Sequence, residues 1–492
     1  MDSNKLIIVL LGLALSCACH AQSECRPTDP TCNPLVSAIS YQSCVSPAAW
    51  HRFEGTVTSS PQFLTAMTPT FDQGMVVVGR APEAFSVGGL APTRPHAGPA
   101  DTEDWSLIKY SRFGNPAWVT FLGGTDSDPG DRPIYVNTTL NGDLLISSRM
   151  QDTFGTPVTA FTGAAGVADA AYVRLDSNGN LIWNTFLGSV GVSDTGGDIR
   201  EFADGRVLTA ATLNALPTFS GSVTGSAYGS SDAAYVILGS DGTQKQLGMF
   251  GGTGAETAIG VVFTDGNAFA LGGHLSAAVD ASFTNTRRAY SAGNDSFLAW
   301  FDSSGQYLAH GYYGGSGSDD LARVLPASNG DVYLVGASDQ SWGSPLAAHP
   351  GPGVWAYFMA RVAVDGSIVW LTFFDAGLTS QPNFFGASVA NNGDLLLTAA
   401  AEAQTGNPLR AFAGSADMLL ARFDQSSGSL ILHTYAGGSS TVELATGGAE
   451  SCDGGYFLTG AGTGNFGSPL NSYPSGSSLG FLSVKITAKG QF

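Results

Sequence analysis

The chain has 492 residues, of which 65 are Gly and only 12% are charged, and its formal net charge is -19. This acidic balance opposes sequence-independent binding to phosphate backbones and to anionic membrane surfaces, so we expect no nucleic-acid partner. Frequent Gly with few charges is typical of strands that alternate with tight turns, and it does not indicate disorder.

Residues 1–21 have the pattern of a signal peptide. Lys5 precedes an apolar run over residues 6–15, which is too short to span a bilayer as a permanent helix, and small residues and cysteines follow it. Two processing outcomes stay open, namely lipid attachment at Cys17 or Cys19 and ordinary cleavage after Ala21. We therefore expect an exported protein. It is either a lipoprotein of the outer membrane, cell surface or periplasm, with a lipid as its sole membrane anchor, or a secreted protein.

Residues 22–48 are rich in Pro and Ser and show no sustained period, which indicates a tether. Cys25 and Cys32 are close enough in sequence to close a small loop by a disulfide. The rest of the chain, residues 49–492, follows one repeat.

Turn glycines in this repeat recur every ~62 residues in two series that run out of phase. The first series is Gly114, Gly179, Gly242, Gly305, Gly366, Gly428 and Gly490, and the second is Gly74, Gly142, Gly205, Gly266, Gly330, Gly393 and Gly454. Two hairpins per repeat mean four strands per repeat, which predicts a radial all-β array of four-stranded antiparallel blades.

The two ends of the repeat region complete each other. The chain stops after the first strand and turn of a hairpin, at residues 480–492, and residues 50–55 match the strand that should follow. An N-terminal outer strand that joins the C-terminal blade closes the ring and leaves no frayed blade. We therefore predict a seven-bladed β-propeller over residues 49–492, and we expect it to be a monomer.

Closure of the last blade also suggests a second disulfide. Cys44 lies shortly before the closing strand, and Cys452 lies beside the turn at Gly454 in the same blade. Six residues can reach across the sheet, so a Cys44–Cys452 disulfide is feasible and would lock the closing strand onto its blade.

Three motifs carry a resemblance to a known family: DAAYVRLDSNGNLIW at 169–183, GSGSDD at 315–320 and NGDVYLVG at 329–336. Together they resemble the bacterial β-propeller repeat known as SBBP, whose members are mostly extracellular or surface proteins. The resemblance implies the fold and export and assigns no chemistry. One repeat departs from the pattern, because its hairpin begins at Trp355 without the leading Asp and its next loop reads DAGLTSQPN from Asp375.

The connections between strands differ in length on the two faces. In propeller order, with strand A innermost and strand D outermost, the A–B and C–D turns are short, whereas the D–A and B–C connections on the other face are long. Long loops on a rigid scaffold are common binding sites, so the sequence favours the long-loop face.

Acidic residues in the D–A loops are candidate metal ligands. Asp126, Asp128, Asp319 and Asp320 could hold a hard cation such as calcium at the channel mouth. Alternatively, each carboxylate accepts backbone N–H bonds in its own Gly-rich turn. No dense calcium-binding loop is present, and we expect no other cofactor.

Candidate ligand-binding residues lie in the B–C loops. An aromatic residue or a His recurs there, including Tyr228 and Tyr290, and it either stacks on sugar rings or anchors the loop by packing. Arg94, His96, Arg287 and Arg288 interrupt the repeat and are better candidates, because a binding site usually breaks a structural period.

The sequence assigns no catalytic residue. Of its seven His, His96, His274 and His349 lie near the long-loop face, and none of these three has a neighbouring Cys, Glu or His at metal-ligand spacing. The chain contains neither a nucleophile elbow nor a phosphate-binding loop. We expect a non-catalytic binding module for a protein or glycan at the cell surface. The alternative is an extracellular glycan-active hydrolase or lyase with a composite carboxylate site at the channel mouth.

Overall fold

The computed structural model describes residues 49–55, 63–81, 83–98, 103–125, 132–163, 166–382, 385–439, 441–473 and 479–491. The predicted signal peptide, the tether and the five cysteines that they contain lie outside these ranges. Within them, no helix is both long enough and apolar enough to cross a membrane.

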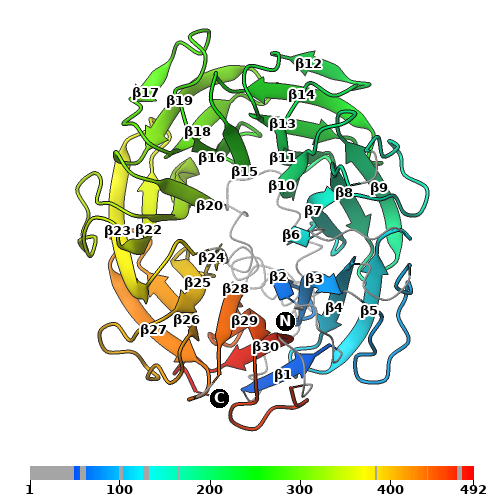
Figure 1. Ribbon diagram of the computed structural model, residues 1–492, viewed down its shortest axis with the longest axis vertical. Coiled ribbons are helices and arrows are strands. Elements are labelled where there is room, and N and C mark those ends of the chain that lie inside the picture. The colour runs from blue at the N-terminus through cyan, green and yellow to red at the C-terminus, as the bar shows by residue number, and fades with distance from the viewer. Residues whose placement is uncertain are drawn as a thin grey trace, which may run out of the picture.

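Seven sheets are arranged around a central channel, and the innermost strand of each sheet, strand A, faces the channel (Figure 1). From inner to outer strand, blade one contains β2 (Phe63–Pro69), β3 (Met75–Ala81), β4 (Asp104–Tyr110) and β5 (Pro116–Leu122). Blade two contains β6 (Arg132–Thr138), β7 (Leu144–Met150), β8 (Asp169–Leu175) and β9 (Leu181–Leu187). Blade three contains β10 (Thr195–Glu201), β11 (Val207–Leu213), β13 (Asp232–Leu238) and β14 (Gln244–Phe250).

Blades four and five contain β15 (Glu256–Phe263), β16 (Phe269–Leu275), β18 (Asp295–Phe301) and β19 (Tyr307–Tyr313); and β20 (Asp319–Pro326), β21 (Val332–Ser338), β22 (Trp355–Val362) and β23 (Ile368–Leu378). A single 3-10 turn, η1 (Ser328–Gly330), joins β20 to β21. Blade six contains β24 (Phe385–Val389), β25 (Leu395–Ala401), β26 (Asp417–Phe423) and β27 (Leu430–Ala436). These boundaries agree with the predicted repeat.

The seventh blade closes the ring as predicted. It contains β28 (Glu443–Glu450), β29 (Tyr456–Gly462) and β30 (Gly480–Ile486), with β1 (Trp50–Glu54) as its outer strand. β1 pairs antiparallel with β30, so that Trp50 lies opposite Lys485 and Glu54 lies opposite Phe481. Cys452, in the turn after β28, is disulfide-bonded. Its predicted partner Cys44, like Cys25 and Cys32, is outside the described residues, so both pairings stay predictions.

A Trp–Gly contact between neighbouring blades gives four of the turn glycines a packing role. The indole of Trp118 on β5 lies against the turn glycine Gly179 of the next blade, where an added Cβ would stand 3.0 Å from the ring. Gly179 also has a φ of 83°, which L side chains rarely adopt. The indole N–H donates to the Ser177 carbonyl at 3.0 Å. Three other blades repeat this contact, through the pairs Trp50–Gly114, Trp183–Gly242 and Trp370–Gly428.

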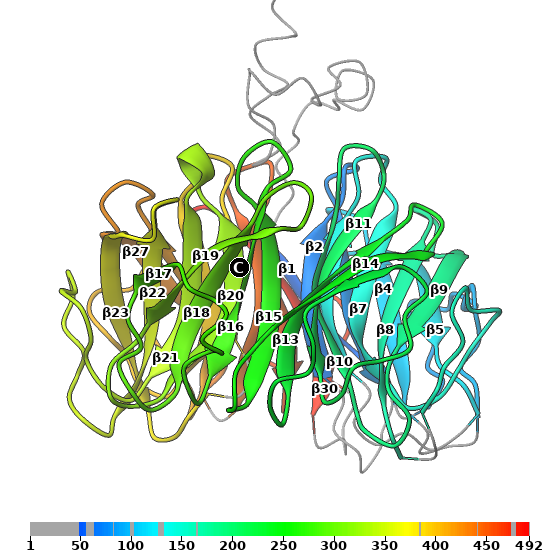
Figure 2. The same ribbon diagram turned by 90° about the horizontal axis from the view of Figure 1, so that it is seen from above.

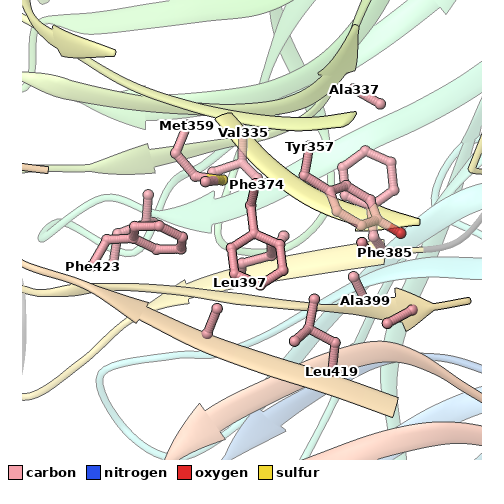
Figure 3. Close-up of a cluster of buried hydrophobic side chains, with 14 of the residues drawn as sticks. Val335, Ala337, Tyr357, Met359, Phe374, Phe385, Leu397, Ala399, Leu419 and Phe423 are labelled. Atoms are coloured by element: carbon pink, nitrogen blue, oxygen red, sulfur yellow. The ribbon is translucent and has the colours of Figure 1, made fainter. Parts of the chain in front are cut away.

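The hydrophobic core lies between adjacent blades and not within one sheet. Figure 3 shows the cluster between blades five and six, in which Met359 and Phe374 from one blade meet Leu397 and Leu419 from the next. All four side chains are buried. Because each sheet buries both faces in this way, its middle strands are almost continuously apolar.

Every B–C connection runs along the outer strand of its own blade. In blades three and four the connection forms a fifth, parallel strand, β12 (Ser222–Thr224) or β17 (Thr286–Arg288), which the sequence analysis did not predict. In the other blades one or two backbone bonds hold the connection to strand D, and these include Thr93 N–H to Val119 O, Val158 to Asn184, Leu346 to Leu371, Leu409 to His433, and Leu470 to His51. The connections thus cover the exposed edge of each blade, and Figure 2 shows them along the sides of the ring.

Candidate functional site

A cavity of about 340 Å³ lies inside the central channel. Its walls come from the C-terminal halves of β2, β6, β10, β20, β24 and β28, and it extends to Phe71, Leu140 and Asn391 in the A–B turns. It therefore occupies the end of the channel where the short turns lie. This is the opposite end from the long-loop face that the sequence favoured.

Strand register identifies the residues that lie at one level of the channel. On six inner strands, one residue lies opposite the fourth residue of strand B; these are Ala66, Tyr135, Gly260, Arg323, Gly386 and Gly447. On β10 a bulge at Gly197 and Asp198 occupies this level. Tyr135 and Arg323 are thus the large side chains among mostly small ones.

Arg323 and Tyr135 meet across the channel. The guanidinium carbon of Arg323, on the fifth blade, lies 5.0 Å from the ring centroid of Tyr135, on the second blade. Burial raises the pKa of the Tyr135 hydroxyl to about 12, while the nearby Arg323 charge acts in the opposite direction. The hydroxyl therefore stays protonated at physiological pH and is a hydrogen-bond donor.

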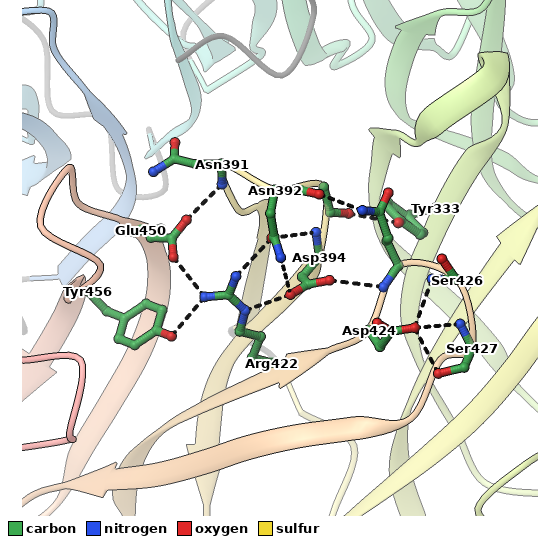
Figure 4. A network of polar contacts seen from close by, with 12 residues as sticks. Tyr333, Asn391, Asn392, Asp394, Arg422, Asp424, Ser426, Ser427, Glu450 and Tyr456 are labelled. Carbon is green, nitrogen blue, oxygen red and sulfur yellow. Dashed lines mark hydrogen bonds and ion pairs between the residues drawn. The ribbon is translucent and has the colours of Figure 1, made fainter. Parts of the chain in front are cut away.

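The carboxylates that line the cavity all have basic partners. Asp198 binds Arg200 at 2.9 Å and also accepts a bond from the Asn137 amide at 2.7 Å. Glu201 binds Arg174 on the preceding blade at 3.0 Å. Glu450 binds Arg422, which also contacts Asp394 and the Tyr456 hydroxyl and so connects blades six and seven (Figure 4). These groups serve as structural links.

Arg323 differs from these basic residues. Its Nη1 donates to the carbonyl of Ala322 at 2.8 Å. Among the residues that the structure describes, it has no acidic partner. The sequence analysis did not identify Arg323 or Tyr135. The available signal was that both interrupt a position occupied by Gly or Ala in other repeats.

The predicted ligand-binding residues lie near the outer edges of the blades. Arg94 and His96 belong to the B–C connection of blade one, where Arg94 stacks on Phe154 and His96 lies against Phe121. Arg287 and Arg288 are on the added strand β17, and Arg287 lies over Trp300 at 4.4 Å. The structure does not bring these residues together into one site.

The recurring aromatic residues of the B–C connections anchor these connections. Tyr290 packs on Tyr312, at a centroid distance of 5.4 Å, and Tyr228 packs on Phe283 of the next blade at 5.6 Å. Four further copies lie on strand D of their own blade, in the pairs Phe161–Phe186, His349–Phe373, Phe412–Tyr435 and Tyr473–Phe53. Of the two interpretations of these rings, packing is the one that the contacts support.

Asp319 belongs to a buried carboxyl pair that several blades repeat. Such pairs join the first residue of a strand C to an acid at the start of the next blade: Asp169 with Asp194, Asp232 with Glu256, Asp295 with Asp319, and Asp417 with Glu443. Burial, together with the partner's charge, raises the pKa of Glu256, Asp319 and Glu443 to about 7. Asp319 accepts the Gly315 N–H at 2.7 Å, as expected of a carboxylate that stabilises its own turn.

The other predicted metal ligands do not complete a cation site. Asp126 and Asp128 are outside the described residues. Within the described ranges, no group of three or more His, Cys, Asp or Glu side chains is arranged to hold a metal ion. Calcium binding thus stays a prediction that depends on residues beyond those ranges.

Asp320 lies in a different setting, beside His274 of the preceding blade. Burial raises the pKa of Asp320, and it lowers the pKa of His274, although each group favours the charged form of the other. The amide of Gln381 donates to Asp320 from the connection after β23 that departs from the repeat. A His–carboxylate pair therefore lies near the long-loop end of the channel.

Comparisons with known proteins do not assign the chain to a family. No protein-family model and no curated protein sequence matches the chain. A protein of unknown function from Dyadobacter fermentans is 10% identical, with a TM-score of 0.42 over 89% of this chain and 97% of that one. A protein of unknown function from Bacteroides caccae is 11% identical, with a TM-score of 0.37 over 77% and 94%. An ulvan lyase is 10% identical, with a TM-score of 0.44 over 89% and 94%. The arrangement of its own seven sheets shows that the chain is a seven-bladed β-propeller.

Proposed function

We propose that this propeller is a non-catalytic binding module that holds a small polar ligand in the channel cavity. The observation that carries the proposal is the single interruption of the small-residue level by Tyr135 and Arg323, directly at the cavity. Its volume of about 340 Å³ lies at the lower end of the usual range for small-molecule sites. The paired state of Asp198, Glu201 and Glu450 argues against a glycosidase-type acid and base in the cavity.

A cavity-filling variant tests this proposal. Ser388 on β24 lines the cavity, and its buried hydroxyl has no hydrogen-bond partner among the described residues. Ser388→Trp therefore fills the space without breaking a hydrogen bond, and Ser388→Ala is the matched control. We would titrate D-glucose, D-galactose, N-acetyl-D-glucosamine and D-glucuronate by calorimetry.

We expect at least one of these sugars to bind the wild type and Ser388→Ala, and not Ser388→Trp. The proposal is wrong if no sugar binds, or if binding survives in Ser388→Trp. Survival of binding would return attention to the long-loop face and to Arg94, His96, Arg287 and Arg288.

A second candidate function, a glycan-active enzyme, rests on the pair His274 and Asp320. A buried imidazole beside a carboxylate is suited to proton transfer, and Gln381 would orient the carboxylate. The test is release of reducing ends from a glycan panel by the wild type and by His274→Asn. Absence of turnover in the wild type would eliminate this candidate.

We also propose that the protein is an exported member of the SBBP-like propellers, either lipid-anchored at Cys17 or Cys19 or secreted. The signal-peptide pattern of residues 1–21, the repeat motifs and the disulfide-bonded state of Cys452 support export. Mass spectrometry of the mature N-terminus tests it. A lipid-modified Cys or a free residue 22 would support export, and an intact Met1 would contradict it.

A further inference from the structure

We propose that the cavity ligand is a hydroxylated carboxylate about the size of an acidic sugar, and that Arg323 anchors its carboxylate. This inference rests on the proposed function, because it names the ligand class of the same cavity. Three features of the site support it: the charge of Arg323, the floor that Arg323 forms with Tyr135, and the hydroxyl and amide groups beside that floor.

The charge of Arg323 is available to a ligand. Arg52, Arg80, Arg174, Arg206, Arg361 and Arg422 all form ion pairs with Asp or Glu. Arg323 has one backbone bond, from Nη1, and a stacking contact with Tyr135. A guanidinium carries five N–H donors in a planar fork that matches a carboxylate. In a chain of net charge -19, an arginine without an acidic partner on a cavity wall selects for an anion.

The floor of the cavity places this charge at the centre of the channel. Arg323 can reach Tyr135 because the neighbouring inner strands carry Gly260, Gly386 and Gly447 at the same level. At Gly386 a Cβ would stand 2.5 Å from the carbonyl oxygen of Thr446, so this strand is closely packed against the next blade. The Arg–Tyr contact thus holds the guanidinium in place before a ligand enters, which reduces the entropy cost of binding.

Polar groups beside the floor are suited to ligand hydroxyls. Ser388 and Asn137 each lie two residues closer to the A–B turns than the floor residue of the same strand. The Ser388 hydroxyl is buried with no partner among the described residues. The Asn137 amide nitrogen is already used by Asp198 and by the Ile199 carbonyl, which leaves its carbonyl oxygen to accept a bond. An acidic sugar matches a fixed cation together with these neutral groups.

The test compares three probes and two arginine variants by calorimetry. D-glucuronate carries the carboxylate and hydroxyls, D-glucose carries only the hydroxyls, and acetate carries only the carboxylate. Arg323→Met removes the charge in the cavity. Arg206→Met removes the same charge from an exposed pair with Asp204 in the A–B turn of blade three, outside the cavity. Melting temperatures verify that both variants are folded.

We expect the wild type and Arg206→Met to bind D-glucuronate, and to bind D-glucose and acetate at least about tenfold more weakly. Arg323→Met should lose at least about tenfold in affinity for D-glucuronate, with no change for D-glucose. The comparison of the three probes on the wild type needs no variant, so it tests the ligand class even if Arg323→Met does not fold.

Equal affinity for D-glucuronate and D-glucose, or an undiminished affinity in Arg323→Met, would overturn the inference. If Ser388→Trp still abolishes binding in that case, the proposed function stands and only the ligand class is wrong. Acetate binding as strongly as D-glucuronate would contradict the role of the hydroxyls. Binding that survives in Ser388→Trp would instead remove the proposed function itself.

Discussion

At the outer edge the seven blades share one arrangement, in which the B–C connection lies along strand D. In most blades an aromatic or His ring of that connection also packs on an aromatic residue. In the channel the blades differ, and a level of mostly small residues is interrupted by Tyr135 and Arg323. The comparison teaches that residues which follow the period stabilise the ring. Residues that break it inside the channel define the candidate site.

The largest expected effect comes from breaking a periodic contact between blades. Trp183→Ala removes the indole from Gly242 and its bond to the Ser240 carbonyl at 2.9 Å. Loss of such a buried aromatic side chain should lower the free energy of unfolding by ~3–5 kcal/mol, measured by denaturant unfolding. Ile182→Ala on the same strand is the control, because that side chain is 49% exposed. Equal effects of the two substitutions would contradict the structural role of the Trp.

A somewhat smaller effect is expected from the ion-pair network at the cavity mouth. Arg422→Met leaves the carboxylates of Asp394 and Glu450 without their guanidinium partner. Because these carboxylates are largely buried, the loss should be about 3 kcal/mol. Arg206→Met breaks an exposed pair and should cost less than ~1 kcal/mol. A loss for Arg422→Met as small as for the control would mean that Glu450 is available for binding or chemistry.

The carboxyl pairs predict a dependence of stability on pH. The folded-state pKa of Glu256 is raised from 4.5 to about 7, chiefly by burial. The folded protein therefore holds a proton that the unfolded chain has released, so this stabilisation is present at low pH and is lost as pH rises through about 7.

We expect a higher melting temperature at pH 5.5 than at pH 8. The free energy of unfolding should likewise be higher at pH 5.5 than at pH 8, and Glu256→Gln should reduce that difference in free energy by about 1–2 kcal/mol. Glu103→Gln, in an ion pair with Arg80, is the control and should leave the pH dependence nearly unchanged. A melting temperature that rises from pH 5.5 to pH 8 would show that the pairs do not hold a proton.

The smallest effect is expected at the channel floor. Arg323→Met keeps the unbranched apolar part of the side chain and leaves no buried carboxylate without a partner, so stability should change by less than ~0.5 kcal/mol. Thermal unfolding of this variant, beside Trp183→Ala, compares a residue that breaks the period with one that follows it. A loss of unfolding free energy close to that of Trp183→Ala would show that the Arg–Tyr contact stabilises the fold and does not serve as a ligand anchor.

Most of the fold was predictable because each repeat contains the same pattern of turns and strands. The turn glycines and the apolar strands appear in nearly every copy, and the Trp of strand D appears in four of the seven. Residues 50–55 match the strand that the last repeat lacks. The alternative in which turn carboxylates bind backbone N–H groups could be stated for the same reason, since Glu256, Asp319 and Glu443 occur at equivalent positions.

The path of the B–C connections was not predictable, because backbone bonds such as Thr93 to Val119 leave no periodic pattern in the sequence. The sequence therefore suggested a free loop face, whereas the structure uses these connections to cover strand edges. Arg94, His96, Arg287 and Arg288 drew attention as outliers, but they lie in different blades near the outside of the ring.

By itself, the sequence determined the number of blades and the closure of the ring, because these depend on local turns and on a pattern repeated along the chain. Only the tertiary structure decided where a ligand site could form. Tyr135 and Arg323 are 188 residues apart in the sequence, yet they meet because ring closure brings blades two and five to opposite sides of one narrow channel.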